Sequence, residues 1–282
     1  MIVVTGATGQ LGRLVIEQLK TKVPADHIVA AVRDPEKAAE LGVEVREADY
    51  DRPETLNSAL AGAQRLLLIS GNEIGERVRQ HTAVVTAARQ AGVERVVYTS
   101  APRADTTSLF LAPDHKATER MIRESGLPFT LLRNNWYTEN YEEGIRQAAR
   151  TGTYLGSADE GRVASAPRAD YAAAAAVVLT TEGHGGRTYE LAGDVAWSFP
   201  ELAAAISAAT GEEVAYRDVS AEDHRAALTT AGLADAVADL LVALDADQAN
   251  GLLAETTGEL KLLIGRPTTP LAETVRELVG RG

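Results

Sequence analysis

The sequence contains no cysteine, few aromatic residues and no long hydrophobic run. The absence of cysteine among 282 residues excludes disulfides, thiolate catalysis and cysteine-based zinc or iron–sulfur sites. The longest apolar run extends from Tyr171 to Leu179, far short of the roughly 18–20 residues that a membrane-spanning helix needs. Met1 leads directly into an apolar segment, with no secretory signal before it. We therefore expect a cytoplasmic protein that does not associate with membranes.

Basic residues are scarce relative to acidic ones. The 28 lysines and arginines face 40 aspartates and glutamates, which leaves a formal net charge of −12. A general nucleic-acid binder needs a basic face, so no nucleic-acid partner is expected. His184 and His224 stand at no metal-ligand spacing from other histidines, so no metal site is expected either.

Short apolar segments alternate with helical segments along the first half of the chain. The apolar segments lie near residues 2, 28, 43, 66, 96 and 129. Strands that alternate with helices predict a parallel sheet covered on both faces. Asp34-Pro35 is predicted to begin a helix, and Ala91-Gly92 to end one. Five strand–helix units fill the first part of the chain, about the length of a Rossmann-type domain.

The spacing of these signals changes after Arg133, where loops become longer and richer in glycine. The sequence therefore predicts an α/β fold with a Rossmann-type, doubly wound parallel sheet and a smaller C-terminal α/β substrate lobe. We assign residues 1–133 to the Rossmann core and residues 134–282 to the substrate lobe, interleaved with the last strands of the core. The alanine run at 172–176 indicates closely packed helices.

A glycine-rich turn joins the first predicted strand to the first predicted helix. Gly6, Gly9 and Gly12 have GxxGxxG spacing, not the GxGxxG of the general dinucleotide fingerprint. The three glycines would allow, in this order, a tight turn, close approach of backbone N–H groups to a pyrophosphate, and close contact between helix and strand. Such turns also occur without a ligand, but the position between an apolar strand and an amphipathic helix favours nucleotide binding. The predicted cofactor-binding residues here are Gly6, Ala7, Thr8, Gly9, Gln10, Leu11 and Gly12.

Arg33 ends the second predicted strand, where dinucleotide-binding folds usually carry an acidic residue that binds the ribose 2′-hydroxyl. An arginine suits a 2′-phosphate instead, so the core 1–133 is expected to bind NADPH. The alternative is a solvent-facing Arg33 that pairs with Glu36. Asp34 is explained by its place as a helix cap.

Several further segments, in order along the chain, carry a resemblance to a known family. They are AVRDPEKA, EADYDRPETL, LLLIS, VVYTSA, ESGLPFTLLRNNWYTENY, ASAPRADYAAAAAVVL, YELAGDVAW and IGRPTTPLAE. Together with the glycine loop, this set resembles the NmrA-like group of atypical short-chain dehydrogenases/reductases nearly from end to end. Within that group it is most similar to the bacterial type 2 NAD(P)H:quinone oxidoreductases.

The resemblance implies a flavin-free enzyme that passes hydride from NADPH to a small-molecule quinone. By position, it implies that the glycine loop holds the pyrophosphate, Arg33 the 2′-phosphate, and Asp49 the adenine side. It also implies that Ser70 lies along the nicotinamide half, together with four residues of the aromatic segment 134–141: Trp136, Tyr137, Asn140 and Tyr141. Aromatic rings suit a flat quinone or nicotinamide. The alternative is that Trp136 and Tyr141 are core residues that join the two lobes.

The Tyr-x-x-x-Lys pair of standard short-chain dehydrogenases is absent. In that pair the Lys lowers the pKa of the Tyr, which can then protonate a carbonyl. Aligned on Glu119, as in family members that keep the pair, Leu111 takes the Tyr position and His115 the Lys position. The absence argues against alcohol dehydrogenation. It favours a quinone, whose reduction gives a delocalised hydroquinone anion that needs little acid help.

Three residues are candidates for a catalytic role. His115 would be a proton donor or a ribose ligand, or else a structural residue of its helix. Thr99, which follows a predicted strand together with Ser100, would bond a quinone oxygen, or else simply begin a loop. Tyr137 belongs to the aromatic segment. We expect positioning of the reactants to matter more than acid catalysis.

Two other functions stay open on the sequence alone. A non-catalytic, NADP(H)-sensing regulatory protein of the NmrA type would also lack the Tyr-Lys pair. A carbonyl or double-bond reductase would carry a Lys in place of His115. A homodimer is left open as the assembly.

The identity of Arg33 generates a prediction about cofactor preference. NADPH should bind about tenfold or more tightly than NADH, because a charge-assisted contact to the 2′-phosphate contributes about 1.5–3 kcal/mol. Arg33→Ala should remove most of this preference and leave the NADH affinity nearly unchanged. Fluorescence titration with both cofactors measures it, and equal affinities in the unmodified protein would contradict the assignment.

Overall fold

The computed structural model describes residues 1–71, 73 and 75–280. Its first body is built on a seven-stranded parallel sheet in the order β3-β2-β1-β4-β5-β6-β9. The strands are β1 (Ile2–Thr5), β2 (Ile28–Val32), β3 (Glu44–Glu47), β4 (Arg65–Leu68), β5 (Arg95–Ser100), β6 (Phe129–Asn134) and β9 (Thr188–Leu191). The strand order reverses between β1 and β4, as in doubly wound Rossmann folds. The predicted fold class is confirmed.

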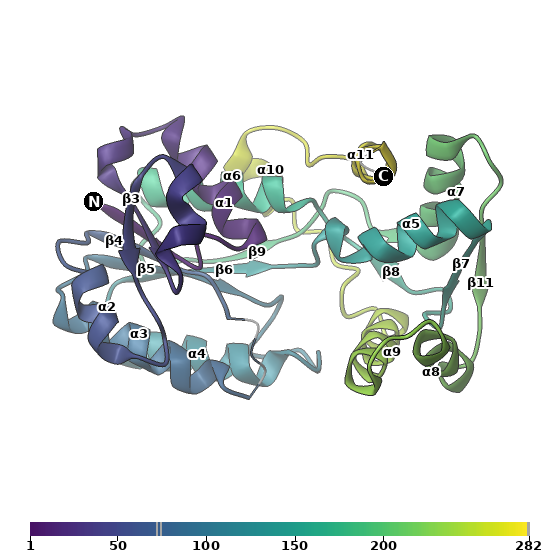
Figure 1. Cartoon of the computed structure of the whole chain (residues 1–282), viewed down its shortest axis with the longest axis horizontal. Helices are drawn as coiled ribbons and strands as arrows, with labels where there is room; N and C mark the ends of the chain where they lie inside the picture. The colour runs from purple at the N-terminus through teal and green to yellow at the C-terminus, as the bar shows by residue number, and fades with distance from the viewer. Residues whose placement is uncertain (72, 74, 281–282) are drawn as a thin grey trace.

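Helices cover both faces of this sheet (Figure 1). One face carries α1 (Gln10–Lys20), α6 (Arg168–Thr180) and α10 (Glu259–Ile264), and the other carries α2 (Pro53–Ala59), α3 (Arg77–Gln90) and α4 (Ala112–Glu124). Successive strand residues point to opposite faces. Val4 and Leu67 therefore pack with the first group of helices, whereas Val3 and Leu66 pack with the second.

The local helix signals act where the sequence predicts them. The carboxylate of Asp34 accepts the backbone N–H of Glu36 and begins a helix, although that helix, Pro35–Leu41, is of the 3₁₀ type. Another short 3₁₀ helix spans Ala25–His27. Gly92, just after the end of α3, has φ +70°, a conformation that favours glycine.

The alanine run lies on α6, which packs directly against α1. The side chains of Ala172, Ala174, Ala175 and Ala176 are all buried in the core that both helices share. Small side chains at a helix contact reduce the distance between the helix axes. The run thus serves the close helix packing that the sequence indicates.

The second body is smaller and lies at the right of Figure 1. Its elements are η3 (Thr138–Tyr141), α5 (Glu142–Thr151), β7 (Thr153–Gly156), β8 (Arg162–Val163), β10 (Trp197–Ser198), α7 (Phe199–Thr210), β11 (Ala215–Asp218), α8 (Ala221–Thr230), α9 (Asp235–Ala249) and α11 (Leu271–Gly280). β7 pairs with β11 in parallel, and β8 pairs with β10 antiparallel. The chain returns to the first body for α6, β9 and α10, so neither body is one continuous stretch of sequence.

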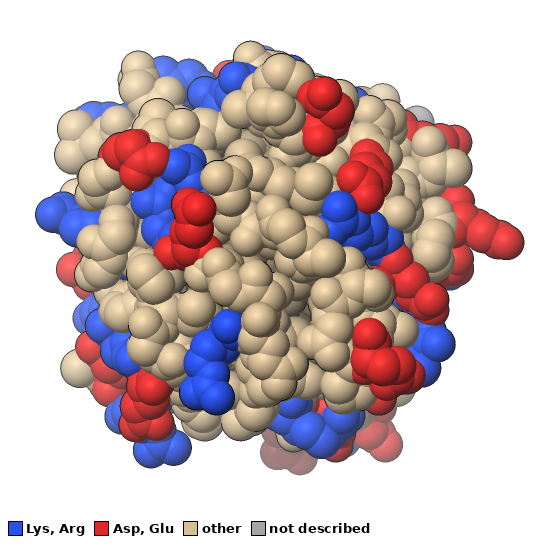
Figure 2. Space-filling model, turned by 90° about the vertical axis from the view of Figure 1, so that its left-hand side faces the viewer, with Lys and Arg blue, Asp and Glu red and all other residues tan. Residues whose placement is uncertain are grey.

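Two further features of the molecule are the apolarity of its helices and the distribution of charge on its surface. Among the described residues, no helix has both the length and the apolarity to cross a membrane. Figure 2 shows acidic and basic side chains interspersed on the face that it presents, with no extended basic area on that face.

A buried carboxylate fastens the link between α10 and α11 to the first body. Asp170, on α6, is 0% exposed. Its carboxylate accepts a hydrogen bond from Nη2 of Arg266 at 2.5 Å. It accepts two more from the backbone N–H and the hydroxyl of Thr269, at 2.7 and 3.2 Å. The link leads from the first body to α11 in the second body, so Asp170 helps to hold the two together.

Removal of this carboxylate should destabilise the protein. In Asp170→Ala, Arg266 and Thr269 lose their acceptor, although water replaces it in part because Arg266 is half exposed. We expect the free energy of unfolding in urea to fall by about 1–3 kcal/mol. The matched variant Asp26→Ala, at an exposed position, should change it by less than about 0.5 kcal/mol. Equal effects of the two substitutions would show that Asp170 has no special role.

Candidate functional site

A cavity of about 730 Å³ opens at the carboxyl ends of β1, β4, β5 and β6. Open α/β sheets bind their ligands at this edge, beside the point where the strand order reverses. The volume is within the range of about 300–1,000 Å³ typical of small-molecule sites. The cavity extends from the glycine loop and Arg33 at one end to Trp136 and Leu253 at the other.

The glycine loop forms one wall of the cavity. Gly6 has φ +60°, in the left-handed region, and its carbonyl accepts the N–H of Gly9 at 2.9 Å. A Cβ atom at Gly12 would lie 2.3 Å from that same carbonyl oxygen, so no side chain fits there. The first N–H groups of α1 have no partner within the helix and suit a pyrophosphate. Ala7, by contrast, is fully buried in the core and does not line the cavity.

Arg33 lines the cavity just after the end of β2, with a side chain that is 71% exposed. Its Nη1 is 3.5 Å from Oε1 of Glu73, so its ion-pair partner is Glu73 and not Glu36. Asp49 also lines the cavity and is held by two local contacts, from the N–H of Asp51 and from Nε of Arg52. Both predicted residues therefore line the cavity, where they follow β2 and β3.

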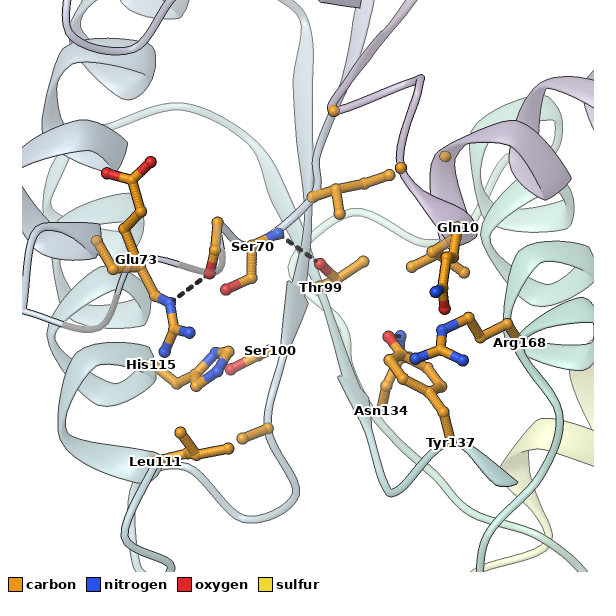
Figure 3. Close-up of a pocket in the computed structure, with 18 of the residues that line it drawn as sticks. Gln10, Ser70, Glu73, Thr99, Ser100, Leu111, His115, Asn134, Tyr137 and Arg168 are labelled. Carbon is orange, nitrogen blue, oxygen red and sulfur yellow. Dashed lines mark hydrogen bonds between the residues drawn. The ribbon is translucent and has the colours of Figure 1, made fainter. Parts of the chain in front are cut away.

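Ser70 and Thr99 lie at the middle of the cavity, at the ends of neighbouring strands (Figure 3). The N–H of Ser70 donates to Oγ1 of Thr99 at 2.9 Å, which fixes the Thr99 hydroxyl in place. Oγ of Ser70 is buried and has no hydrogen-bond partner among the described residues. Ser100 is already engaged, because its hydroxyl donates to Glu119 at 2.6 Å. Thr99 is thus the better placed of the two adjacent hydroxyls for contact with a ligand.

An aromatic wall faces this middle part, and Figure 3 shows Asn134, Tyr137 and Arg168 together on that side. Nδ2 of Asn134 donates to the hydroxyl of Tyr137 at 3.1 Å, whereas its buried Oδ1 has no partner in the described chain. The Arg168 guanidinium lies 4.7 Å above the Tyr137 ring and donates to Oδ1 of Asn140. Burial raises the pKa of Tyr137, so its phenol stays protonated.

The two other aromatic residues of this segment have different positions. Trp136 lines the cavity and also packs partly against the core of the second body. Tyr141 does not line the cavity. Its ring packs edge-to-face on Trp197 and Phe199, at centroid distances of 5.1 and 5.8 Å, and its hydroxyl accepts Nε2 of Gln248. The prediction that Tyr141 contacts the cofactor does not match this position, whereas the alternative of a core residue does.

His115 lies on the opposite wall, beside Leu111 (Figure 3). The imidazole is 8% exposed, and its Nδ1 lies 2.9 Å from the hydroxyl of buried Tyr98. Burial lowers the pKa of His115 to about 3, with a smaller effect from the nearby charge of Arg77. The imidazole is therefore neutral at physiological pH and does not act as a cationic acid.

Buried hydrogen bonds hold His115 and the neighbouring His81 in place. Nε2 of His81 accepts the N–H of Gly71, so His81 is protonated on Nδ1 and donates to Thr118. Thr118 in turn donates to the carbonyl of Asp114. Nδ1 of His115 shares a hydrogen bond with the phenol of Tyr98, in which the donor depends on the tautomer of the imidazole. This bond fixes the orientation of the His115 ring, which lines the cavity.

Sequence reasoning missed several residues that line the cavity. Arg77 lies in a helix that carries no recognised motif, Arg168 was not singled out, and Leu253 follows α9, far along the chain from the other lining residues. Arg168 stands within a segment that carries the family resemblance, which is the one signal that could have found it. The orientation of Arg77 depends on the packing of α3 against α4, which no local pattern shows.

Comparison with known proteins agrees with a dinucleotide site. Residues 6–182 match the family described as NAD(P)H-binding. The chain is 50% identical over 281 residues to quinone oxidoreductase 2 of Escherichia coli (strain K12), covering 99% of this chain and 98% of that protein. It is similar to the solved structure of an NADPH-dependent quinone oxidoreductase from Escherichia coli complexed with NADPH, with a TM-score of 0.95, 49% identity and 99% of both chains covered. It is also similar to the Citrobacter sp. triphenylmethane reductase complexed with NADP(H), with a TM-score of 0.95, 43% identity, and 99% of this chain and 100% of that chain covered.

The low pKa of His115 generates a prediction about the pH dependence of turnover. His115→Ala should lower kcat/KM with NADPH by less than about tenfold, below the range of about 10²–10⁴ for a positioned general acid. Because the group titrates near pH 3, the unmodified protein and the variant should have parallel, flat profiles between about pH 5 and 8. A hundredfold loss of kcat together with the loss of a pH–rate limb near neutrality would make His115 the acid.

Proposed function

This chain belongs to the NAD(P)H-binding family, in its NmrA-like branch of short-chain dehydrogenases/reductases, and we propose that it is an NADPH-dependent quinone reductase. Similarity over nearly the full length to a quinone oxidoreductase supports this function. The acceptor is a small-molecule quinone, which is reduced by direct hydride transfer without a flavin.

The similarity to a quinone oxidoreductase carries the proposal, and the neutrality of His115 and Tyr137 at the reacting end of the cavity agrees with it. The pKa of His115 is lowered to about 3 and that of Tyr137 is raised, in both cases mainly by burial. Among the described residues at this end, the cavity therefore offers neutral hydrogen-bond donors but no acid that titrates near pH 7. Reduction of an ordinary carbonyl forms an alkoxide, which needs such an acid. A quinone forms a delocalised hydroquinone anion, which does not.

The cavity residues fit NADPH. The glycine loop and the first turn of α1 would hold the pyrophosphate, Arg33 the 2′-phosphate, and Asp49 the adenosine side. Oγ of Ser70 and Oδ1 of Asn134, both buried without partners among the described residues, would be satisfied by the nicotinamide half. Trp136, Tyr137 and Asn140 line the same half. When bound there, NADPH supplies a hydride with its electron pair.

The residues of the reacting end would position the acceptor. Tyr137 is held on one side by the edge-to-face ring of Tyr171 at 5.2 Å and on the other by the guanidinium of Arg168. This rigid ring offers a flat wall for the quinone. Leu109 and Leu111 would exclude water from the opposite side, where the Thr99 hydroxyl would donate to a quinone oxygen and His115 would lie beside the ring.

The second body would act as the substrate lobe, since Trp136 and Leu253 bring it to the cavity. We propose the division into residues 1–133 and 134–282 in this sense, with α6, β9 and α10 interleaved into the core. A cytoplasmic location and the absence of a nucleic-acid partner stay predictions from the sequence, and a homodimer stays open as the assembly.

The proposed function is tested by mixing purified protein with NADPH and a small benzoquinone. NADPH absorbance should fall only when the quinone is present, with turnover of about 1–10³ s⁻¹ as in typical enzymes. Hydroquinone should form in equal amount. The protein should be colourless, and added flavin should not change the rate.

Substitutions in the aromatic wall test the quinone site separately from NADPH oxidation. Trp136→Ala and Tyr137→Ala should mainly raise the quinone KM, because each removes part of the flat wall. NADPH binding without quinone-dependent oxidation would instead favour the NADP(H)-sensing regulator. Stoichiometric flavin absorbance after purification would contradict direct transfer.

A further inference from the structure

Arg77, the first residue of α3, places a positive charge in the wall of the cavity. The residue is 6% exposed and lines the cavity with His115 and Ser100. Its Nε donates to the carbonyl of Gly71 at 2.8 Å, but its buried Nη1 makes no hydrogen bond to any described residue. A buried guanidinium is costly unless its donors find acceptors, so this arrangement points to a ligand with an anionic or carbonyl oxygen.

The groups that surround Arg77 leave its charge only partly compensated. Its carboxylate partner is Asp114 of α4, whose Oδ2 lies 3.7 Å from Nη1, too far for a hydrogen bond. The titratable groups that respond to its charge are His81 on α3, His115 on α4 and Tyr98 on β5, all of them neutral. The other cavity arginine that faces the reacting end, Arg168, is better compensated, because it stacks on Tyr137, donates to Asn140 and lies 3.6 Å from Glu139.

We propose that Arg77 stabilises the negative charge that develops on the quinone oxygen during reduction. The inference rests on the proposed quinone reductase function. It names Arg77 as the residue that supplies electrostatic stabilisation during hydride transfer. It also specifies the acceptor, because the reducible oxygen must reach the α3/α4 wall while the ring lies against Tyr137.

The charge balance of the reaction explains why a fixed cation is useful. The quinone gains a hydride, which is two electrons and one proton, while NADPH becomes NADP⁺. The product is a hydroquinone monoanion, which water then protonates. Because the negative charge appears only as the hydride moves, a cation beside the oxygen stabilises the transition state more than the bound quinone. Arginine stays charged at any working pH, so this stabilisation needs no proton transfer.

The position of Arg77 favours the acceptor over the phosphates of the cofactor. The glycine loop and Arg33 lie at the end of the cavity formed by β1 and β2. Arg77, by contrast, forms an ion pair with Asp114 of α4. Asp114 is the sequence neighbour of His115, which Figure 3 shows facing the side of Asn134 and Tyr137 across the cavity. Arg77 therefore belongs to the wall where the acceptor and the nicotinamide would meet.

The test compares Arg77→Met and Arg77→Lys in the full-length protein, with benzoquinones of graded reduction potential. Arg77→Met should lower kcat about 10²-fold, the effect of losing one preorganised donor to a developing oxyanion. Arg77→Lys keeps the charge and should recover part of the loss. The slope of log kcat against quinone potential should become steeper in Arg77→Met, because the acceptor must then bear the charge unaided. Guanidinium ion added to Arg77→Ala should restore part of the activity.

Further measurements separate this role from a structural or cofactor-binding one. The Kd for NADPH from fluorescence and the thermal unfolding midpoint of Arg77→Lys should be little changed. Arg89→Met, at an exposed position near the end of the same helix, should behave as the unmodified protein. An unchanged kcat in Arg77→Met, or a loss explained entirely by weaker NADPH binding with an unchanged slope, would overturn the proposal. If the unmodified protein reduces no quinone, the proposed function fails, and this inference fails with it.

Discussion

The cavity depends on the contact between the carbonyl of Gly6 and the Cα of Gly12. A Cβ atom at position 12 would lie 2.3 Å from that oxygen, so only glycine lets α1 approach the end of β1 this closely. The approach places the unpaired N–H groups of the first helical turn at the carboxyl edge of the sheet. Ser70, Thr99 and Asn134 reach the same edge because they lie at or just after the ends of β4, β5 and β6. The cofactor end and the reacting end are therefore set by one packing arrangement.

The reacting end combines neutral donors with a fixed positive charge. Burial keeps His115 and Tyr137 neutral near pH 7, while a hydrogen bond with Tyr98 orients the His115 ring. Arg77 adds a charge that no proton transfer can change. Such a site suits a reaction whose anionic product is stable by delocalisation, and it suits poorly the reduction of a simple ketone. The missing Tyr-Lys pair and the electrostatics of the site thus point to the same class of acceptor.

The residues predicted from motifs line the cavity where they follow directly on a strand, because parallel strands end at one edge of the sheet. Residues in turns and helices are less predictable. Ala7 turns into the core below the glycine loop, and the short helix η3 directs Tyr141 into the aromatic core of the second body. Both are close in sequence to lining residues, but backbone direction decides which side a side chain takes. Arg77 shows the converse, since only the packing of α3 against α4 brings it to the cavity.

The sequence by itself determined the alternation of strands and helices, the glycine loop, the arginine at the end of β2 and the absence of the Tyr-Lys pair. These are local patterns, which neighbouring residues specify. Only the tertiary structure decided that His115 is neutral, that Arg33 pairs with Glu73 and that Arg77 lies in the cavity. Tyr98 is 17 residues from His115, and Glu73 is 40 residues from Arg33. Burial and ion pairing depend on such distant groups, because the pKa of a side chain responds to everything packed around it in space.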